Sequence, residues 1–139
     1  VFDNPEEDEP DSCLFSKEDL VIRGTGTLNV DANYMNAIVS KDGLTIADGI
    51  YNLTSINHGI KGKDYLTING GELNVTAIGD GIKSTNYETE LVGYVEINGG
   101  TIHARNGANI FGGTPSGKVK VTAKAGGGKK ATCTITVTK

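Results

Sequence analysis

The chain has 139 residues, of which 37% are hydrophobic, and it carries 20 glycines, no tryptophan and a formal net charge of −4. This composition excludes a large globular core and favours short strands joined by tight turns. The basic residues form no patch interleaved with aromatic residues, and no run of about 18 apolar residues occurs, so we expect neither nucleic-acid binding nor membrane insertion.

Residues 1–12 are acidic and contain Pro5 and Pro10, which opposes a packed strand. We therefore predict an acidic loop in this segment. The loop is either simply solvated, or its Glu9 and Asp11 contribute oxygen ligands to a calcium ion, which binds about six to eight oxygens in proteins.

A repeat of about 22 residues begins at Cys13 and recurs along the chain. Within each repeat apolar residues alternate with polar ones, as at Leu66 and Ile68, and the alternation is broken by Gly or Asn. A period of two predicts strands, and three short strands per repeat predict one coil of a solenoid whose equivalent residues stack about 4.8 Å apart. We predict an all-β, right-handed parallel β-helix of about five coils over residues 1–112.

The register of the repeats assigns four interior columns to this solenoid. They are Leu14, Ile38, Ile60, Ile82 and Ile110; Leu20, Leu44, Leu66 and Val95; Ile22, Ile46, Ile68 and Ile97; and Leu28, Tyr51, Leu73 and Ile102. Each buried aliphatic side chain contributes roughly 1.5–3 kcal/mol. A polar substitution in one column should therefore damage the coils on both sides.

Charged side chains also recur in register, outside the predicted core. Lys17, Lys41 and Lys63 stand beside Asp19, Asp42 and Asp64, and Lys61 and Lys83 form a shorter column. These columns are either solvated turns whose charges block edge pairing, or a groove that contacts sugar acids and cations.

Residues 85–94 interrupt the fourth coil and contain Tyr87 and Tyr94. Insertions in solenoids emerge as loops on one face, often the binding face. The tyrosines either stack on sugar rings or cover the core, and the sequence favours neither.

Residues 113–139 have a different pattern, with two alternating segments separated by three glycines. We predict a C-terminal β-hairpin, which either caps the last coil or supplies strands to a partner. Cys13 and Cys133 do not have the spacing of a zinc site, and we expect buried thiols, with one disulfide as the alternative. His58 and His103 are each isolated, so no catalytic residue is predicted.

Three segments, SKEDLVIRGTGTLNV, HGIKGKDYLTINGGELNV and GDGIKS, closely resemble the bacterial carbohydrate-binding domain family of calcium-binding parallel β-helices. The likeness covers residues 1 to about 112, whereas residues 113–139 resemble the end of a bacterial group 2 immunoglobulin-like domain. The resemblance also implies that family coils precede residue 1. It further implies a secreted or cell-surface module that binds calcium and an acidic polysaccharide such as polygalacturonate, without catalysis.

Candidate site residues follow from the columns, the insertion and this resemblance. The candidate metal ligands are Asp80, Asp64, Asp42, Asp19, Glu9 and Asp11. The candidate polysaccharide-binding residues are Lys61, Lys63, Lys83, Tyr65, Tyr87 and Tyr94.

Two other functions stay open at this point. One is a structural subunit of a surface fibre, assembled by head-to-tail stacking of solenoids. The other is an enzyme of the pectate-lyase type, which is disfavoured because Arg23 and Arg105 are the only arginines and neither shares a column with the candidate acids.

Overall fold

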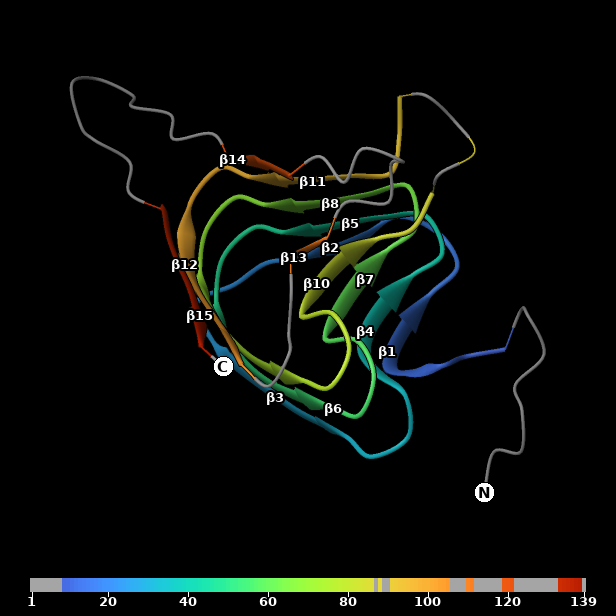
Figure 1. Ribbon diagram of the computed structural model, residues 1–139, viewed down its shortest axis with the longest axis horizontal. Coiled ribbons are helices and arrows are strands. Elements are labelled where there is room, and N and C mark those ends of the chain that lie inside the picture. The colour runs from blue at the N-terminus through green and yellow to red at the C-terminus, as the bar shows by residue number, and fades with distance from the viewer. Residues whose placement is uncertain are drawn as a thin grey trace.

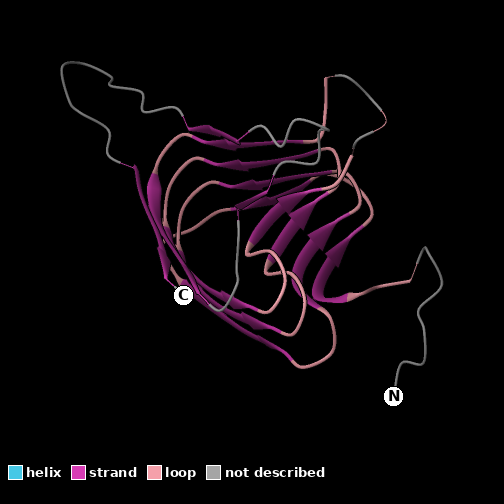
Figure 2. Ribbon diagram, viewed as in Figure 1, coloured by secondary structure: helices cyan, strands magenta, loops and turns pink. Residues whose placement is uncertain are grey.

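In this computed structural model the described residues are 9–86, 88, 91–105, 110–111, 119–121 and 133–138. The regular elements in these ranges are all strands, joined by turns and loops (Figure 2). In the part of the chain so described, no helix is long and apolar enough to span a membrane. The all-β prediction is confirmed.

The strands form three five-stranded sheets, and successive strands along the chain enter sheet 1, sheet 2 and sheet 3 in turn (Figure 1). Sheet 1 contains β1 (Ser12–Ser16), β4 (Asn36–Ser40), β7 (Ile60–Gly62), β10 (Ile82–Ser84) and β13 (Ile110–Phe111). Sheet 2 contains β2 (Leu20–Ile22), β5 (Gly43–Ile46), β8 (Tyr65–Ile68), β11 (Tyr94–Ile97) and β14 (Val119–Val121). Sheet 3 contains β3 (Thr27–Ala32), β6 (Ile50–Ser55), β9 (Glu72–Ala77), β12 (Gly100–Arg105) and β15 (Cys133–Thr138).

Neighbouring strands pair in parallel in all three sheets, which is the arrangement of a β-solenoid. The register aligns Ile38, Ile60 and Ile82 with one another, as the repeat predicts. The other three predicted columns are aligned in the same way. Alternate residues of each strand point inward because the side-chain period is two, and this explains the repeated apolar pattern.

The closed interior covers fewer coils than the approximately five that the sequence predicts. Apolar side chains are fully buried in three successive coils, β4–β6, β7–β9 and β10–β12. In the coil of β1–β3 Ala32 is buried, but the larger apolar side chains are only partly buried, and Leu14 remains 36% exposed. No described strand pairs with the outer edges of β1, β2 and β3, so one side of this coil lacks cover.

The two C-terminal segments are strands, but they do not form the predicted hairpin. β14 pairs in parallel with β11, whereas β15 pairs in parallel with β12 in a different sheet. Alternating residues fit either pairing direction, so the sequence pattern alone did not distinguish a hairpin from continued winding. The free edges of β11 and β12 offer each segment a partner with a matching register.

Cys13 is a free and exposed thiol, so the expectation of a buried side chain is wrong for this residue. It precedes the inward-facing Leu14 and therefore points to the opposite side of β1. The side chain of Cys133 lies outside the described residues.

Glycines align at the corner between sheets 2 and 3, where the chain turns sharply. Gly71 has φ of 90°, which favours glycine, and a Cβ at this position would lie 2.6 Å from the carbonyl oxygen of Gly49 in the preceding coil. Gly100 has φ of 93° and stands in the same relation to Gly71. The repeated glycines therefore allow the coils to approach closely at this corner.

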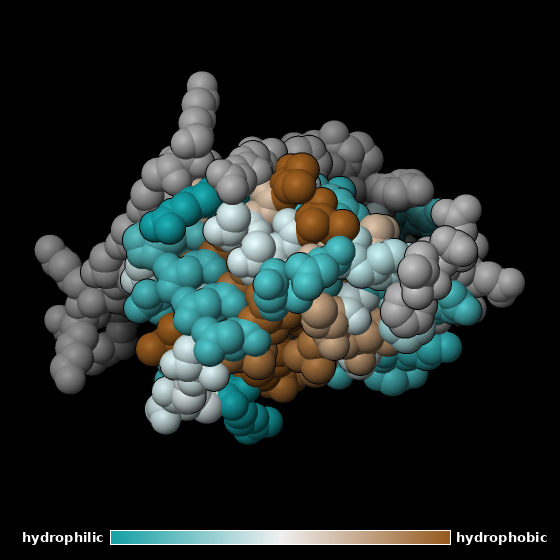
Figure 3. Space-filling view, turned by 90° about the horizontal axis from the view of Figure 1, so that it is seen from below, coloured by the Kyte–Doolittle hydropathy of each residue, from teal (hydrophilic) through white to brown (hydrophobic). Residues whose placement is uncertain are grey.

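The corner from sheet 3 to sheet 1 forms the face seen in Figure 3, below the view of Figure 1. Brown, hydrophobic side chains lie there among hydrophilic ones. Ile56 and Ile78 follow β6 and β9 at this corner, and Ile78 is 72% exposed. Exposed apolar residues of this kind are ordinary on protein surfaces, so we assign no function to the pair.

Candidate functional site

Two groups of polar side chains lie on the outside of the solenoid. The tyrosine–aspartate corner comprises Asp19, Asp42, Asp64, Tyr65 and Tyr94, where the chain passes from sheet 1 to sheet 2. The histidine ladder comprises Asp11, Asn36, His58 and Asp80, at the entrance to sheet 1. Five of the six predicted metal ligands are therefore divided between these two groups, and Glu9 belongs to neither.

The aspartates of the corner hold successive turns together. Asp19 accepts a hydrogen bond from the backbone N–H of Gly43 through Oδ1, at 2.8 Å. Asp64 accepts one from Nδ2 of Asn86 through Oδ1, at 2.7 Å, and its own N–H donates to the carbonyl of Asp42. Each turn thus presents an oxygen-bearing side chain beside the equivalent turn of the next coil.

Asp42 lies near other carboxyl groups at this corner. Desolvation raises its pKa, and so do the neighbouring carboxyl group of Asp64 and the negative charge of Asp19. The proximity of the acids therefore favours a shared proton, or a cation in its place.

Two tyrosines stack beside these aspartates on the outer face of sheet 2. The rings of Tyr65 and Tyr94 lie 5.8 Å apart between centroids, at 15° between their planes. Both side chains are half-buried, and the register places the two residues opposite each other on β8 and β11. The stack is therefore an aromatic surface built by two neighbouring coils.

Gly43 explains where the ring of Tyr65 can lie. Gly43 is the register partner of Tyr65 on β5, and a Cβ at Gly43 would overlap the tyrosine ring. The ring thus lies over the glycine of the preceding coil and comes close to Asp19, which lies one coil further back and accepts the N–H of Gly43. Desolvation, followed by the nearby Asp19, raises the pKa of the Tyr65 phenol.

The histidine ladder links successive coils by side chain to backbone hydrogen bonds. Asn36 donates through Nδ2 to Oδ2 of Asp11 at 2.9 Å and accepts from the N–H of His58 at 3.0 Å. The N–H of Asp80 in turn donates to Nδ1 of His58, at 3.0 Å. The other ring nitrogen, Nε2, lies 3.5 Å from Nζ of Lys83.

Two lysines neutralise the acids at the ends of this ladder. Nζ of Lys61 lies 2.8 Å from Oδ2 of Asp11, and Nζ of Lys83 lies 2.9 Å from Oδ2 of Asp80. Burial, and then the positive charge of Lys83, lower the pKa of His58. The predicted ligand Lys61 thus ties the N-terminal segment to a coil about 50 residues away along the chain.

The ladder is a poor calcium site, because an ammonium group already lies against each of its carboxylates. Oδ1 of Asp11 is buried without a hydrogen-bond partner in the structure, but a cation beside it would also face Lys61. Asp42 and Asp64 fit a divalent ion better, since the two carboxyl groups adjoin each other. Over the described residues, no group of three or more His, Cys, Asp and Glu side chains is placed to hold a metal ion.

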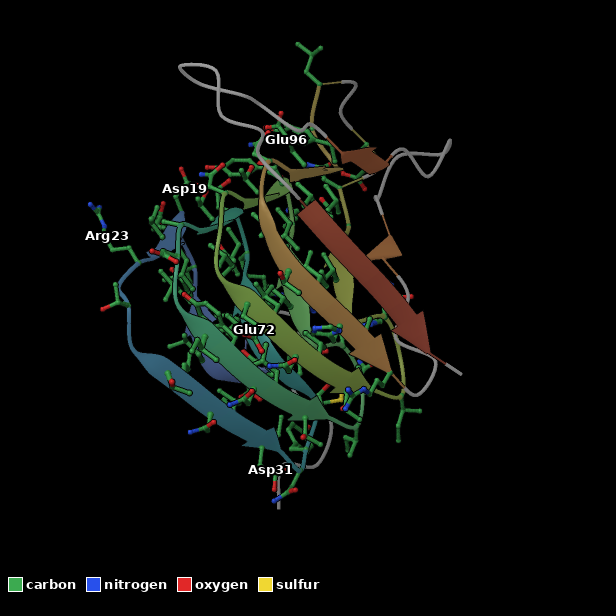
Figure 4. All side chains as sticks on the ribbon, turned by 90° about the vertical axis from the view of Figure 1, so that its left-hand side faces the viewer. Asp19, Arg23, Asp31, Glu72 and Glu96 are labelled. Atoms are coloured by element: carbon green, nitrogen blue, oxygen red, sulfur yellow. The ribbon has the colours of Figure 1, made fainter. Side chains whose placement is uncertain are left out.

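Of the remaining predicted residues, Lys63 directly precedes Asp64 in the turn of the tyrosine–aspartate corner. Lys63 is exposed, Glu9 is exposed at the N-terminal end, and Tyr87 lies outside the described residues. Figure 4 shows Asp19 at the opposite end of the solenoid cross-section from Asp31, with Arg23 extending away from the ribbon. Glu9 borders a pocket near Asp31 instead of joining the other predicted metal ligands.

Sequence reasoning did not identify Asn36, His58 and Gly43 as organising residues. Asn36 is fully buried and His58 links two coils, although both occupy an ordinary turn position of the repeat. Gly43 and Tyr65 are register partners, and a glycine aligned with a tyrosine in the next repeat was a readable signal in the sequence. His58, which the sequence shows as an isolated histidine, accepts a hydrogen bond from the backbone of Asp80.

Known proteins resemble this chain in both sequence and structure. A carbohydrate-binding domain-containing protein of Acetivibrio thermocellus is 38% identical over 48 residues, which are 34% of this chain and 17% of that protein. A solved structure described as the polysaccharide lyase-like protein from C. thermocellum, a gadolinium derivative, is 34% identical with a TM-score of 0.70. That match covers 99% of this chain and 56% of the other, so this chain spans about half of that protein.

The match to a family extends over nearly the whole chain. Residues 2–137 match the family described as carbohydrate-binding domain-containing protein, and the matched range includes both the predicted β-helix and the C-terminal segments. The parallel three-sheet solenoid agrees with the fold of the solved relative. The chain belongs to the carbohydrate-binding domain-containing protein family.

Proposed function

We propose that the chain binds an acidic polysaccharide of the polygalacturonate type at the tyrosine–aspartate corner, assisted by calcium and without catalysis. Membership of a carbohydrate-binding family supports a polysaccharide ligand in general. The observation that carries the choice of site is the Tyr65–Tyr94 stack beside the two successive turns that carry Asp42 and Asp64, whose backbones are hydrogen-bonded to each other.

The tyrosines supply the contact with the sugar rings. A half-buried aromatic ring offers a rigid apolar surface at a small cost in conformational entropy, and its hydroxyl remains able to form hydrogen bonds. The stack spans two coils, whose strands lie about 4.8 Å apart. A stack that extends over two coils can contact one sugar ring of a polysaccharide and the beginning of the next sugar ring.

Calcium would supply the electrostatic part of this binding. Asp42 and Asp64 would hold the ion, and its positive charge would offset the repulsion between the protein carboxylates and those of the polysaccharide. The raised pKa of Asp42 supports this assignment, because neighbouring acids that favour a shared proton also favour a cation. An incomplete protein ligand set leaves positions for the polysaccharide and for water.

We further propose that the chain binds the polysaccharide without cleaving it. A lyase requires a base positioned near the acidic sugar. Arg23 is exposed and points away from the ribbon in Figure 4, and the lysines of the histidine ladder are engaged in ion pairs. We expect no rise in unsaturated-uronate absorbance when the protein is incubated with pectate and calcium. Because such polysaccharides lie outside cells, the proposal implies secretion or display at the cell surface.

The proposal is tested by pull-down on immobilised polygalacturonate, in calcium and in chelator. We expect retention in calcium, loss in chelator, and about three- to tenfold weaker retention for Tyr65→Ala, since one aromatic contact contributes about 0.5–1.5 kcal/mol. Asp31→Asn is the matched surface control, because Asp31 lies at the far end of β3. Retention that is the same in calcium and in chelator, and the same for the wild-type chain and Tyr65→Ala, would exclude this site.

A second function, head-to-tail assembly into a surface fibre, is favoured by one observation. Leu14 is 36% exposed, whereas its register partners Ile38 and Ile60 are fully buried. A second solenoid placed against β1, β2 and β3 would cover this side by parallel pairing. Sedimentation should then show concentration-dependent oligomers, and a monomer at all concentrations and salt strengths would rule out this function.

A further inference from the structure

A pocket lies away from the tyrosine–aspartate corner, where β3 turns into β4. Its volume is about 500 Å³, and its wall is mainly apolar. Tyr34 and Met35 line it from the turn, and Cys13 lines it from β1. A volume of this size lies within the range of small-molecule sites and accommodates a single sugar ring.

Acidic side chains distinguish this pocket from a purely apolar cavity. Glu9 and Asp31 are both exposed and line it together with Asn33. No lysine or arginine is among the residues that line this described pocket. The pocket therefore presents negative charge and hydrogen-bonding oxygens around an apolar wall that includes the ring of Tyr34.

This combination selects the chemistry of the ligand. Carboxylates repel a uronate and attract an ammonium group, while the amide of Asn33 suits sugar hydroxyls. The apolar wall suits the hydrogen-bearing face of a sugar ring, and an ammonium group near an aromatic ring gains further attraction. A ligand with one protonated amine on a compact hydroxylated ring satisfies all of these groups.

We propose that this pocket binds an amino sugar, with the amine near Glu9 and Asp31 and the ring against Tyr34 and Met35. The inference rests on the proposed function only in taking a sugar as the class of ligand. The pocket lies away from the tyrosine–aspartate corner. It favours a positively charged sugar, whereas the ligand proposed for the corner is negatively charged. The chain would then recognise two different sugars through two separate surfaces.

Cys13 gives a direct readout of pocket occupancy in the unmodified chain. Its exposed thiol lines the pocket, so a bound ligand should shield it from N-ethylmaleimide. The reaction is followed at about pH 6.5, where the amine is protonated, by mass spectrometry of the peptide that contains Cys13. Methyl glucosaminide at about ten times its Kd should slow the modification about tenfold, because only the unoccupied fraction reacts.

Matched ligands and variants test whether the amine of the sugar and the acids of the pocket are responsible for the protection of Cys13. Methyl glucoside and galacturonate should protect Cys13 much less than methyl glucosaminide, and Asp31→Asn should weaken protection about two- to fivefold. Glu72→Gln removes one acid from the same sheet outside the pocket and should have no effect. Equal protection by the glucoside, or no protection by the amino sugar, would overturn the proposal.

Two further outcomes keep this inference distinct from the proposed function. Calcium chloride alone should not protect Cys13, and protection by calcium would identify a cation site and contradict an amino-sugar pocket. Asp31→Asn should retain calcium-dependent binding to polygalacturonate. If the wild-type chain does not bind polygalacturonate but methyl glucosaminide protects Cys13, only the proposed function is contradicted. If the chain binds polygalacturonate but methyl glucosaminide does not protect Cys13, only the pocket proposal is contradicted.

Discussion

The tyrosine–aspartate corner and the histidine ladder are built from the same repeat but differ in how their side chains are used. In the ladder, Asn36 and His58 are hydrogen-bonded to the backbone of the next coil, and Asp80 is paired with Lys83. At the corner, Tyr65 and Tyr94 form a half-buried stack on the outer face of sheet 2. The ladder therefore links successive coils, whereas the corner keeps its groups on the surface, where we propose that the polysaccharide binds.

The comparison shows that spacing along the chain is not sufficient to define a site. Acids recur at similar intervals in both groups, yet a lysine neutralises Asp80 and another acid adjoins Asp42. The partner of each carboxylate decides whether the carboxylate stabilises the fold or remains available to a cation. Substitutions that affect one group but spare the other therefore test the account.

The largest effect is expected from Ile60→Asp, which should abolish both groups by disrupting their shared core. Ile60 is fully buried between register partners in two neighbouring coils, and a buried unpaired charge costs about 4 kcal/mol or more. Thermal unfolding followed by circular dichroism should show loss of the cooperative transition. Ile78→Asp, at a 72% exposed isoleucine, is the control and should change stability by about 0.5 kcal/mol or less.

Gly43→Ala should damage the corner and spare the ladder. The added Cβ would overlap the ring of Tyr65 and displace it from its place over β5. We expect polygalacturonate binding to weaken about three- to tenfold. The pKa of the Tyr65 phenol should also return toward its ordinary value, which absorbance titration measures.

Gly26→Ala is the control for this substitution, since a Cβ at Gly26 would meet no atom within 4 Å. It should leave both the phenol titration and the binding unchanged. Equal binding by the Gly43 and Gly26 variants would show that the position of the Tyr65 ring is irrelevant to the ligand.

Lys83→Met should have the reverse selectivity, lowering stability without affecting polysaccharide binding. The substitution keeps the apolar stem and removes the ammonium group from Asp80. We expect a loss of about 1 kcal/mol in the free energy of unfolding, measured in urea. Lys17→Met, at an exposed position, should cost less. A Lys83→Met variant that keeps its stability but loses binding would reverse the roles of the two groups.

The smallest effect concerns the pH dependence of the ladder. Burial and Lys83 hold the pKa of His58 below its ordinary value of 6.5, so the unfolded chain takes up a proton before the folded chain does. The contribution of His58 to stability is therefore fully present above about pH 6.5 and decreases as the pH falls below this value. Urea unfolding at about pH 7.5 and about pH 5.5 should show the decrease, and His58→Asn should reduce it. An identical decrease in that variant would assign the effect to other groups.

Much of the fold was predictable because apolar periodicity and register depend on local sequence. The columns through Ile60 and Leu66 are as predicted. The parallel pairing of β14 and β15 was not predicted, since alternation does not reveal which strand edge receives a segment. The division of the candidate acids between two groups depends on contacts across coils, such as that between Lys61 and Asp11, which the sequence does not display.

The most direct test of the account is calorimetric titration of the chain with a polygalacturonate oligomer, with and without calcium. It compares the wild-type chain with the double variant Asp42→Asn and Asp64→Asn, which keeps the shape of both side chains but removes their charges. We predict binding by the wild-type chain in calcium, none in chelator, and no calcium-dependent binding by the double variant. Wild-type affinity in the double variant, or equal binding in chelator, would contradict the central claim.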